Sequence, residues 1–236
     1  MSLPRVNETL NFVMEIPSTG KKVKYRPYLV KEEKVLLQAF ESKDTKMCLQ
    51  AMSDTISACL DPSAEVDVEK LATFDLEYMF TQLRGKSVGE ISTILISCKE
   101  CEKHNEYNID LDKLKVSVER NKNIIKITDT ISVEMRYPTY ESFIVDDLEN
   151  SAKDINSALK ILASSVAAIL TPSERIDTTG KPKEEIIEFL SSMTASQLKQ
   201  LTDFLENMPA LKHQANFVCD CGAENSLELK GLSDFF

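Results

Sequence analysis

The residues with the clearest chemistry are four cysteines that form two close pairs. Cys98 and Cys101 are separated by two residues, and Cys219 and Cys221 by one. Each pair lies where an apolar strand is expected to turn into a second strand. A tight turn places two thiolates on one side of an ion, and two facing turns complete the tetrahedron that zinc prefers. Soft thiolates favour zinc or an iron–sulfur centre over magnesium or calcium.

We therefore predict one structural zinc ion per chain, with Cys98, Cys101, Cys219 and Cys221 as its ligands. Four thiolates leave no open position for a substrate, so such a site supports folding rather than catalysis. The alternative is that these are ordinary buried thiols, because free cysteine is often packed in apolar surroundings. The spacing between Cys219 and Cys221 is one residue shorter than the usual spacing, which leaves the geometry of that turn open.

The remaining histidines and cysteines have simpler interpretations. His104 and His213 each lie near a cysteine pair and are alternative ligands or outer-shell groups, although a plain surface histidine is the simpler interpretation. Cys48 and Cys59 are 11 residues apart, about three helical turns, so both fall on one apolar helix stripe. Core packing explains them.

No sequence motif indicates an enzyme. The chain has no glycine-rich dinucleotide loop, P-loop or nucleophile elbow. The stretch 84–89 superficially resembles a phosphate loop, but it follows an expected helix, so we interpret Gly85 and Gly89 as helix-ending residues. An exposed basic turn that contacts a partner is the alternative. We predict no catalytic residues and no small-molecule substrate.

Charge and composition exclude several classes of partner. The 236 residues contain 28 Lys and Arg against 38 Asp and Glu, which gives a net charge of −10. Broad nucleic-acid contact and binding to anionic membranes both require a basic surface, so we expect neither. The N-terminus lacks the apolar core of a signal peptide, and the longest apolar segment, 158–170, is too short to cross a bilayer. These features indicate an intracellular protein with free or metal-bound thiols.

The chain resembles one unit written twice. Residues 23–27 resemble 133–138, and residues 56–63 resemble 166–173, both at an offset of 110. The segments around the two cysteine pairs also correspond, at an offset of about 120. Chance similarity explains any one match, but three matches in the same order favour duplication.

The resulting fold prediction is α+β, with two pseudo-repeated halves over 1–118 and 119–236. Each half contains a β-hairpin, a helical segment and a cysteine-bearing β-hairpin, and a split zinc-ribbon-like site joins them. In the first half we expect strands over 10–16 and 23–29, helices over 31–42, 44–60 and 74–84, and strands over 91–97 and 106–111. In the second half we expect strands over 124–128 and 131–137, helices over 152–170, 183–190 and 195–207, strands over 215–218 and 224–229, and a terminal phenylalanine tail.

The order of motifs resembles the base plate protein family of T-even-type contractile-tailed phages. The resemblance spans nearly the whole chain and is carried by IPSTG (16–20), YRPY (25–28), KEEK (31–34), DLEY (75–78), QLRGKSVG (82–89), the two cysteine pairs and GLSDFF (231–236). It implies a non-enzymatic late viral protein that contacts other baseplate hub proteins during tail assembly in the host cytoplasm. The resemblance fits both a virion component and an assembly chaperone.

A second class of function stays open from the residues alone. A zinc-ribbon adaptor of the transcription or replication machinery would use the same cysteines, by analogy at the level of the fold. The net charge of −10 counts against direct nucleic-acid binding by such an adaptor, but not against protein contacts. A domain-swapped dimer would also bring a first and a second cysteine pair together.

Overall fold

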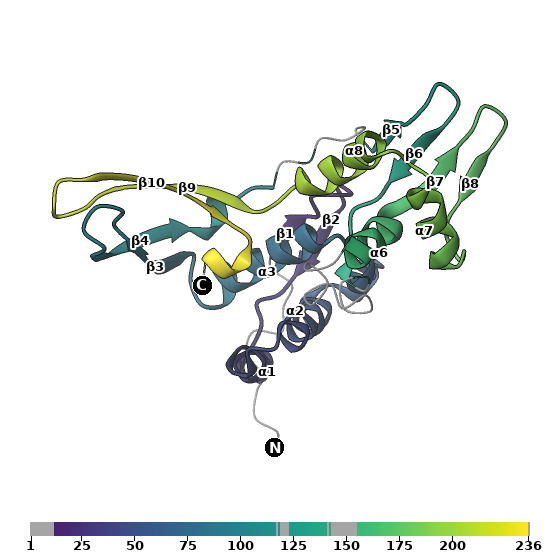
Figure 1. Ribbon diagram of the computed structural model, residues 1–236. Coiled ribbons are helices and arrows are strands. Elements are labelled where there is room, and N and C mark those ends of the chain that lie inside the picture. The colour runs from purple at the N-terminus through teal and green to yellow at the C-terminus, as the bar shows by residue number, and fades with distance from the viewer. Residues whose placement is uncertain (1–11, 117, 119–122, 141, 143–154, 236) are drawn as a thin grey trace, which may run out of the picture. The chain divides into compact units, whose positions relative to one another are not determined.

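The chain forms two compact units with antiparallel sheets and helices (Figure 1). The computed structural model describes residues 12–116, 118, 123–140, 142 and 155–235. Unit 1 comprises Met1–Ser117 and Pro209–Phe236, and unit 2 comprises Val118–Met208. The α+β class is confirmed. The units differ from the predicted halves, because the C-terminal hairpin belongs to unit 1, and the duplication itself is not shown.

The described part of unit 1 contains three hairpins and three α-helices. The first hairpin pairs Met14 with Val23 in an antiparallel register, and its turn contains Gly20 at φ 71°. The elements of unit 1 are β1 (Phe12–Glu15), β2 (Lys22–Tyr25), α1 (Val30–Ser42), α2 (Thr45–Cys59), α3 (Thr73–Ser87), β3 (Ile91–Ser97), β4 (His104–Asp110), β9 (Lys212–Val218) and β10 (Glu224–Lys230), with short 3₁₀ turns η1 (Pro62–Ala64), η2 (Val68–Lys70), η3 (Leu111–Lys113) and η4 (Leu232–Asp234).

The helix boundaries of unit 1 follow local chemistry. The side chain of Asp44 accepts a hydrogen bond from the Met47 amide (3.1 Å) and so caps the start of α2. The helix α2 ends at Cys59, shortly before Pro62, because proline disfavours helical geometry in the residue before it. The prediction that Gly85 ends α3 is wrong: the helix runs through Gly85 to Ser87, and Gly89 follows at φ 148°. Gly85 is buried in α3 and packs next to Leu111.

The basic last turn of α3 is engaged within the fold. Lys86 is only 18% exposed in its side chain and forms ion pairs with Glu90 and Asp112. Its ammonium group also lies 5.8 Å from the ring centre of Phe12. The alternative of a freely exposed basic contact surface therefore does not apply to Lys86.

A buried carboxylate connects the first hairpin to α3. Asp75 is fully buried, and its Oδ1 accepts a hydrogen bond from the Ser18 amide (2.8 Å). Its Oδ2 has no hydrogen-bond partner among the described residues. Burial raises the pKa of Asp75, and the hydrogen bonds from Ser18 offset only part of that effect. Ionisation of this side chain therefore opposes folding.

In its described residues, unit 2 contains one four-stranded antiparallel sheet in the order β5-β6-β7-β8, together with three helices. Thr194 and Gln197 form a capping box at the start of the last helix. The elements are β5 (Ile124–Lys126), β6 (Ser132–Met135), α6 (Ile155–Ser165), β7 (Val166–Leu170), β8 (Arg175–Asp177), α7 (Lys183–Ser191) and α8 (Ala195–Glu206). Their shared core contains Val133, Met135, Leu162, Ala163, Val166, Ile186, Leu190 and Leu201.

The expected helix over 152–170 is wrong at its C-terminal end. The helix α6 ends at Ser165, and the next five residues form β7, a central strand paired with both β6 and β8. The Ser165 carbonyl accepts a hydrogen bond from the Arg136 amide (2.7 Å), which marks the switch. Pairing on both edges overrides a segment whose apolar pattern fits either structure. Residues 152–154 lie outside the described residues.

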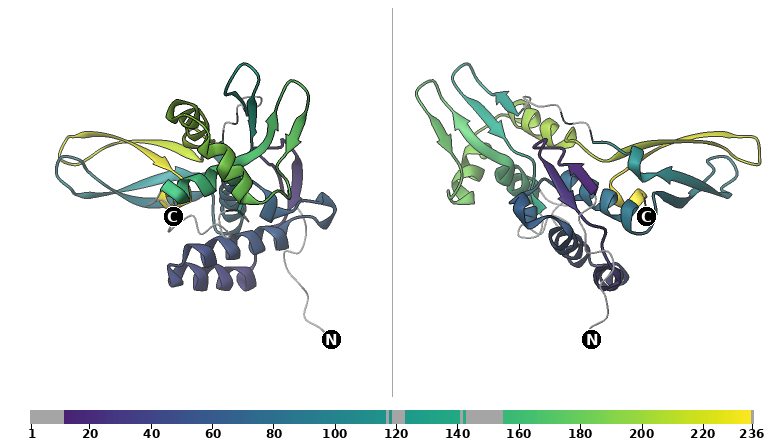
Figure 2. Two further views of the ribbon diagram at one scale, coloured as in Figure 1. Left: turned by 45° about the vertical axis from the view of Figure 1, so that its right-hand side comes forward. Right: turned by 180° about the vertical axis from the view of Figure 1, so that it is seen from behind.

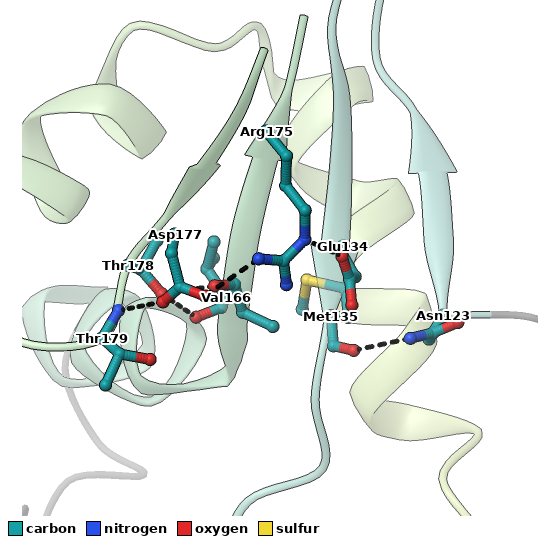
Figure 3. A network of polar contacts seen from close by, with 9 residues as sticks. Asn123, Glu134, Met135, Val166, Arg175, Asp177, Thr178 and Thr179 are labelled. Carbon is teal, nitrogen blue, oxygen red and sulfur yellow. Dashed lines mark hydrogen bonds and ion pairs between the residues drawn. The ribbon is translucent and has the colours of Figure 1, made fainter.

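Polar contacts fasten the strands of this sheet to one another (Figure 3). Arg175 of β8 donates to Glu134 of β6 (3.0 Å) and to Asp177 (2.9 Å). The Thr178 hydroxyl donates to the Val166 carbonyl at the start of β7 (2.7 Å). The side chains of Arg175 and Asp177 are about half exposed, where ion pairs contribute little stability, whereas the Thr178 hydrogen bond is buried.

No helix in the described ranges combines the length and the apolar character needed to cross a bilayer.

We predict that replacing Asp75 with asparagine changes how stability depends on pH. The pKa of Asp75 is raised above its ordinary value of 3.8, so the folded state holds this proton more tightly than the unfolded chain. The contribution to stability is greatest at acid pH and is lost as the pH rises through the raised pKa. Relative to the unchanged protein, Asp75→Asn should therefore gain free energy of unfolding as the pH rises above the ordinary pKa of 3.8 toward neutrality.

Urea denaturation at several pH values measures this difference. Asp54→Asn, at an exposed position of α2, is the matched control. Curves for Asp75→Asn and the unchanged protein that run parallel over the whole range would contradict the prediction.

Candidate metal centre

Two hairpins from distant parts of the sequence carry the four cysteines. The hairpins β3–β4 and β9–β10 lie side by side in all three views (Figures 1 and 2). Each is paired over seven residues in an uninterrupted antiparallel register. Their inner faces share one apolar core, so packing rather than the cysteines alone brings the hairpins together. This core contains Ile96, Ile109, Leu111, Leu114, Leu211, Ala215, Leu229 and Phe235.

The C-terminal aromatic tail belongs to the same core. Phe235 is completely buried, and its carbonyl accepts a hydrogen bond from the Ser92 hydroxyl (2.6 Å). Phe235 therefore docks onto the chain's own core. Phe236 lies outside the described residues.

The first cysteine turn connects β3 to β4. The Cys98 amide donates to the Lys103 carbonyl (2.9 Å), and the Glu102 amide donates to the Cys98 carbonyl (3.0 Å). Glu102 has a left-handed backbone at φ 59°, which lets the chain reverse directly after Cys101. The turn therefore directs both sulfurs to one side.

The second turn repeats this geometry with one residue fewer. The Cys219 amide donates to the Ala223 carbonyl (3.0 Å), and the Gly222 amide donates to the Cys219 carbonyl (2.8 Å). Gly222 has φ 89°, so again a left-handed residue directly follows the second cysteine. The shorter spacing of Cys219 and Cys221 thus reflects a three-residue hairpin loop, which commonly ends in a left-handed residue.

The four sulfurs meet in one cluster, which we call the cysteine cluster. The Sγ atoms of Cys98, Cys101, Cys219 and Cys221 all lie within 4.8 Å of one another. Across the two hairpins, Cys98 lies 3.8 Å from Cys221 and Cys101 lies 3.7 Å from Cys219. Four sulfurs at about 2.3 Å from a zinc ion form a tetrahedron with edges of roughly 3.8 Å. The donor set and its spacing therefore fit a tetrahedral thiolate-bound metal.

Backbone amides make part of the cluster acidic. The pKa of Cys98 is lowered to about 6 by the backbone N–H groups of Cys101 and Glu100. The backbone N–H of Cys221 similarly lowers the pKa of Cys219. At Cys101 the Lys103 amide lowers the pKa, but the neighbouring thiols and burial outweigh it and raise the pKa to about 12. Four adjacent thiolates require a cation, and metal binding would displace the remaining protons.

Two asparagines support the cluster in a reciprocal arrangement that the sequence analysis did not identify. Asn225, which is buried, donates to the Cys98 sulfur (3.4 Å) and to the Ala223 carbonyl (3.1 Å), and accepts from the Lys99 amide (3.0 Å). Asn105 donates to the Lys103 carbonyl (2.8 Å) and hydrogen-bonds Cys219. Each asparagine lies four residues after the second cysteine of its own turn. This shared spacing is the sequence signal from which a matched pair of supporting residues could have been predicted.

The other candidate residues have separate contacts. His104 pairs with the Ser97 hydroxyl (3.0 Å) and His213 with the Tyr107 hydroxyl (3.2 Å), and neither is part of the cysteine cluster. Cys59 is buried in the core, and Cys48 contacts the Ala39 carbonyl, as expected for packing thiols. An ion pair between Lys103 and Asp220 adds a further link between the two turns.

We predict that Asn225→Ala weakens metal retention while leaving both hairpins folded. The variant removes the hydrogen bond to the Cys98 sulfur and the link to the Lys99 amide. Loss of such outer-shell contacts typically reduces metal affinity by about 10–100-fold. Competition with a coloured chelator measures the affinity.

Asn216→Ala is the matched control for this variant. Asn216 lies in the same hairpin and accepts a hydrogen bond from the Ser226 hydroxyl (2.7 Å), away from the sulfurs. Equal metal affinities for the two variants would contradict a supporting role for Asn225.

Comparison with known proteins places the chain in a family. The family model described as T4 bacteriophage base plate protein matches residues 8–236, including both cysteine pairs. The protein lin-9 homolog of Macaca fascicularis is 27% identical over 182 residues, which make up 71% of this chain and 30% of that protein. This chain thus spans 30% of the length of that relative. No solved structure matches the chain. The match over nearly the whole chain confirms the resemblance seen in the motifs, and the chain belongs to the T4 bacteriophage base plate protein family.

Proposed function

We propose that this protein is a non-enzymatic factor of phage tail morphogenesis that acts on the baseplate hub through protein contacts. Its place is the host cytoplasm during assembly, as a chaperone or as a hub component that enters the virion. The family match over residues 8–236 carries this proposal, because membership implies contacts with other baseplate proteins. The chemistry of the cysteine cluster is consistent with it, since four thiolates around one ion leave no position for a substrate.

We propose further that the cysteine cluster holds one structural zinc ion per chain. Two observations support zinc: the inter-hairpin sulfur distances of 3.7 and 3.8 Å, and the backbone amides that stabilise the thiolate forms of Cys98 and Cys219. When bound, the ion would supply a cross-link between the tips of the two hairpins. The residues themselves orient the sulfurs through the two turns and through Asn225.

A duplicated origin for 1–118 and 119–236 remains our proposal, with a split zinc-ribbon-like site where the halves meet. Two pairs of equivalent contacts support it. Arg26 donates from its amide to the Cys59 carbonyl and from its side chain to the Ala58 carbonyl. Arg136, 110 residues after Arg26, contacts the Ser165 and Ser164 carbonyls in the same way. These carbonyls lie 106 residues after those of Cys59 and Ala58, so the two sets of contacts correspond by their place at the end of a helix and not by the 110-residue offset. The reciprocal asparagines at the cysteine cluster form the second pair.

We predict that the purified, tag-free protein binds one zinc ion and depends on it for stability. Native mass spectrometry should give a monomer with one zinc ion, and the double variant Cys101→Ser with Cys221→Ser should give a metal-free mass. Thermal unfolding with and without chelator should show a lower midpoint after zinc removal, because metal binding contributes folding free energy.

Cys48→Ser is the matched control, since this cysteine lies outside the cysteine cluster and should leave the zinc content unchanged. Metal-free protein with an unchanged unfolding midpoint would identify the four cysteines as ordinary thiols.

The assembly role predicts a specific defect in phage lacking this gene. Electron microscopy of infected cells should show few or no complete tails, and expression of the unchanged protein should restore them. Mass spectrometry of purified virions separates a retained component from a chaperone. Deletion phage that still produce complete tails at the normal level would exclude both versions of the proposed function.

A further inference from the structure

A groove of about 670 Å³ lies between the two cysteine-bearing hairpins. Its walls are five consecutive residues of β3, Thr93–Ser97, and three of β10, Leu227–Leu229, with Asp234 of η4 at one end. Its volume lies in the range of ligand-binding clefts. Because consecutive strand residues line it, the groove exposes backbone as well as side chains.

The edge of β3 that faces away from β4 has unused hydrogen-bonding groups. The Leu111 amide donates to the Glu90 carbonyl (2.8 Å), and the Cys98 amide donates to the Lys103 carbonyl (2.9 Å). Since bonded and non-bonded residues alternate in an antiparallel pair, the amide and carbonyl of Thr93 and Leu95 point away from β4. In the described part of the chain, no hydrogen bond engages these main-chain groups.

The facing edge of β10 is open at its centre. By the same alternation, Ser226, Glu228 and Lys230 direct their main-chain groups away from β9. The Lys99 side chain donates a hydrogen bond to the Ser226 carbonyl (2.9 Å), and the Asp234 side chain accepts one from the Lys230 amide (2.8 Å). The main-chain groups of Glu228 have no hydrogen-bond partner among the described residues. Two strand edges with open main-chain groups therefore line one groove.

The sequence of β3 lacks the usual protection of an edge strand. Natural edges carry charges, proline or bulges that prevent pairing with another chain. β3 has the sequence ISTILIS, without a charged residue, and Ile91 and Leu95 are 56% and 68% exposed. The other three strands of the two hairpins each contain charged residues. The exposed apolar side chains and the open backbone favour a polypeptide strand as the occupant.

The charge around the groove selects the kind of strand. The two hairpins with their flanking residues, 91–113 and 212–234, contain five lysines against nine aspartates and glutamates. The two charged residues that line the groove, Glu228 and Asp234, are both acidic. Elsewhere on the hairpins, the exposed side chains of Glu102, Glu106 and Glu224 form no ion pair within the described ranges. A second copy of this chain would carry the same excess of negative charge on its hairpins and the same net charge of −10. A basic segment is electrostatically complementary.

We propose that this groove binds an extended, lysine- or arginine-bearing segment of another baseplate protein, which adds as a strand to the open edge of β3. The segment would bond through its backbone to Thr93 and Leu95, and an apolar side chain of the segment would cover Leu95. About five residues of strand span Thr93–Ser97, since each residue extends roughly 3.3 Å. The source of the segment rests on the proposed function, whereas the groove and its chemistry do not.

The test uses proline at an outward-pointing amide. Leu95→Pro removes an unused N–H and blocks strand addition while sparing the β3–β4 hydrogen bonds, because proline is tolerated at such edge positions. Glu106→Pro is the matched control, since Glu106 lies opposite Leu95 in register and its amide points to the other edge of the hairpin. Circular dichroism and zinc content establish that both variants are folded.

The probe is a set of overlapping 15-residue peptides that cover the hub proteins of the same phage. Fluorescence anisotropy should identify a basic, extended peptide that the unchanged protein and Glu106→Pro bind alike. Leu95→Pro should bind it at least tenfold more weakly, and added salt should weaken all binding. Hydrogen exchange on the unchanged protein gives a test that requires no variant, because bound peptide should slow exchange at the amides of Thr93 and Leu95.

Three results would overturn the inference: no peptide binds, Leu95→Pro binds as well as Glu106→Pro, or bound peptide leaves the Thr93 and Leu95 amides unprotected. A concentration-dependent dimer that Leu95→Pro abolishes would identify a second copy as the occupant and also overturn it. Intact hub proteins that bind the unchanged protein and Leu95→Pro equally would reject this groove but retain the proposed function. Complete tails from deletion phage would reject the proposed function alone.

Discussion

The meeting of two hairpins that are far apart in the sequence is the constraint on which unit 1 depends. Cys101 and Cys219 are 118 positions apart, yet their sulfurs lie 3.7 Å from each other. The intervening chain contains all of unit 2, so unit 1 is complete only when its C-terminal hairpin returns. A covalent cross-link that closes about 100 residues restricts the unfolded chain by roughly 4–5 kcal/mol in the chain-entropy model. A metal held by both hairpins would act in the same sense.

The apolar core beneath the hairpins shares this task with the cysteine cluster. Ile109, Leu111 and Phe235 are completely buried in this core, which joins the β3–β4 hairpin to the C-terminal part of unit 1. Cys98 and Cys219, the first cysteine of each turn, are buried beside this packing, whereas Cys101 and Cys221 are exposed. The buried sulfurs are also those that receive the hydrogen bonds of Asn225 and Asn105. The cluster therefore has a preorganised inner side and an accessible outer side.

Local signals in the sequence were sufficient for most elements and for the cysteine cluster, but not for the long-range arrangement. The hairpins and most helix boundaries follow from turn residues, capping side chains and apolar spacing, as at Asp44 and Thr194. Val166–Leu170 could not be assigned locally, because a short apolar run fits a helix or a buried strand until its neighbours are known. Gly85 was misassigned because its closeness to Leu111 is a tertiary contact.

The cysteine cluster and the groove between the hairpins are coupled through the strands that they share. β3 runs into Cys98, and β10 leaves the second turn soon after Cys221, so the spacing of the two sulfur-bearing tips sets the spacing of the two open edges. Lys99 strengthens the coupling, since its amide bonds Asn225 and its side chain bonds the Ser226 carbonyl. A metal at the tips would thus limit how far the groove can widen, and a strand bound in the groove would hold the tips in register for the metal. Under these two proposals each ligand would stabilise the arrangement that the other requires, which is the thermodynamic condition for positive cooperativity between two sites.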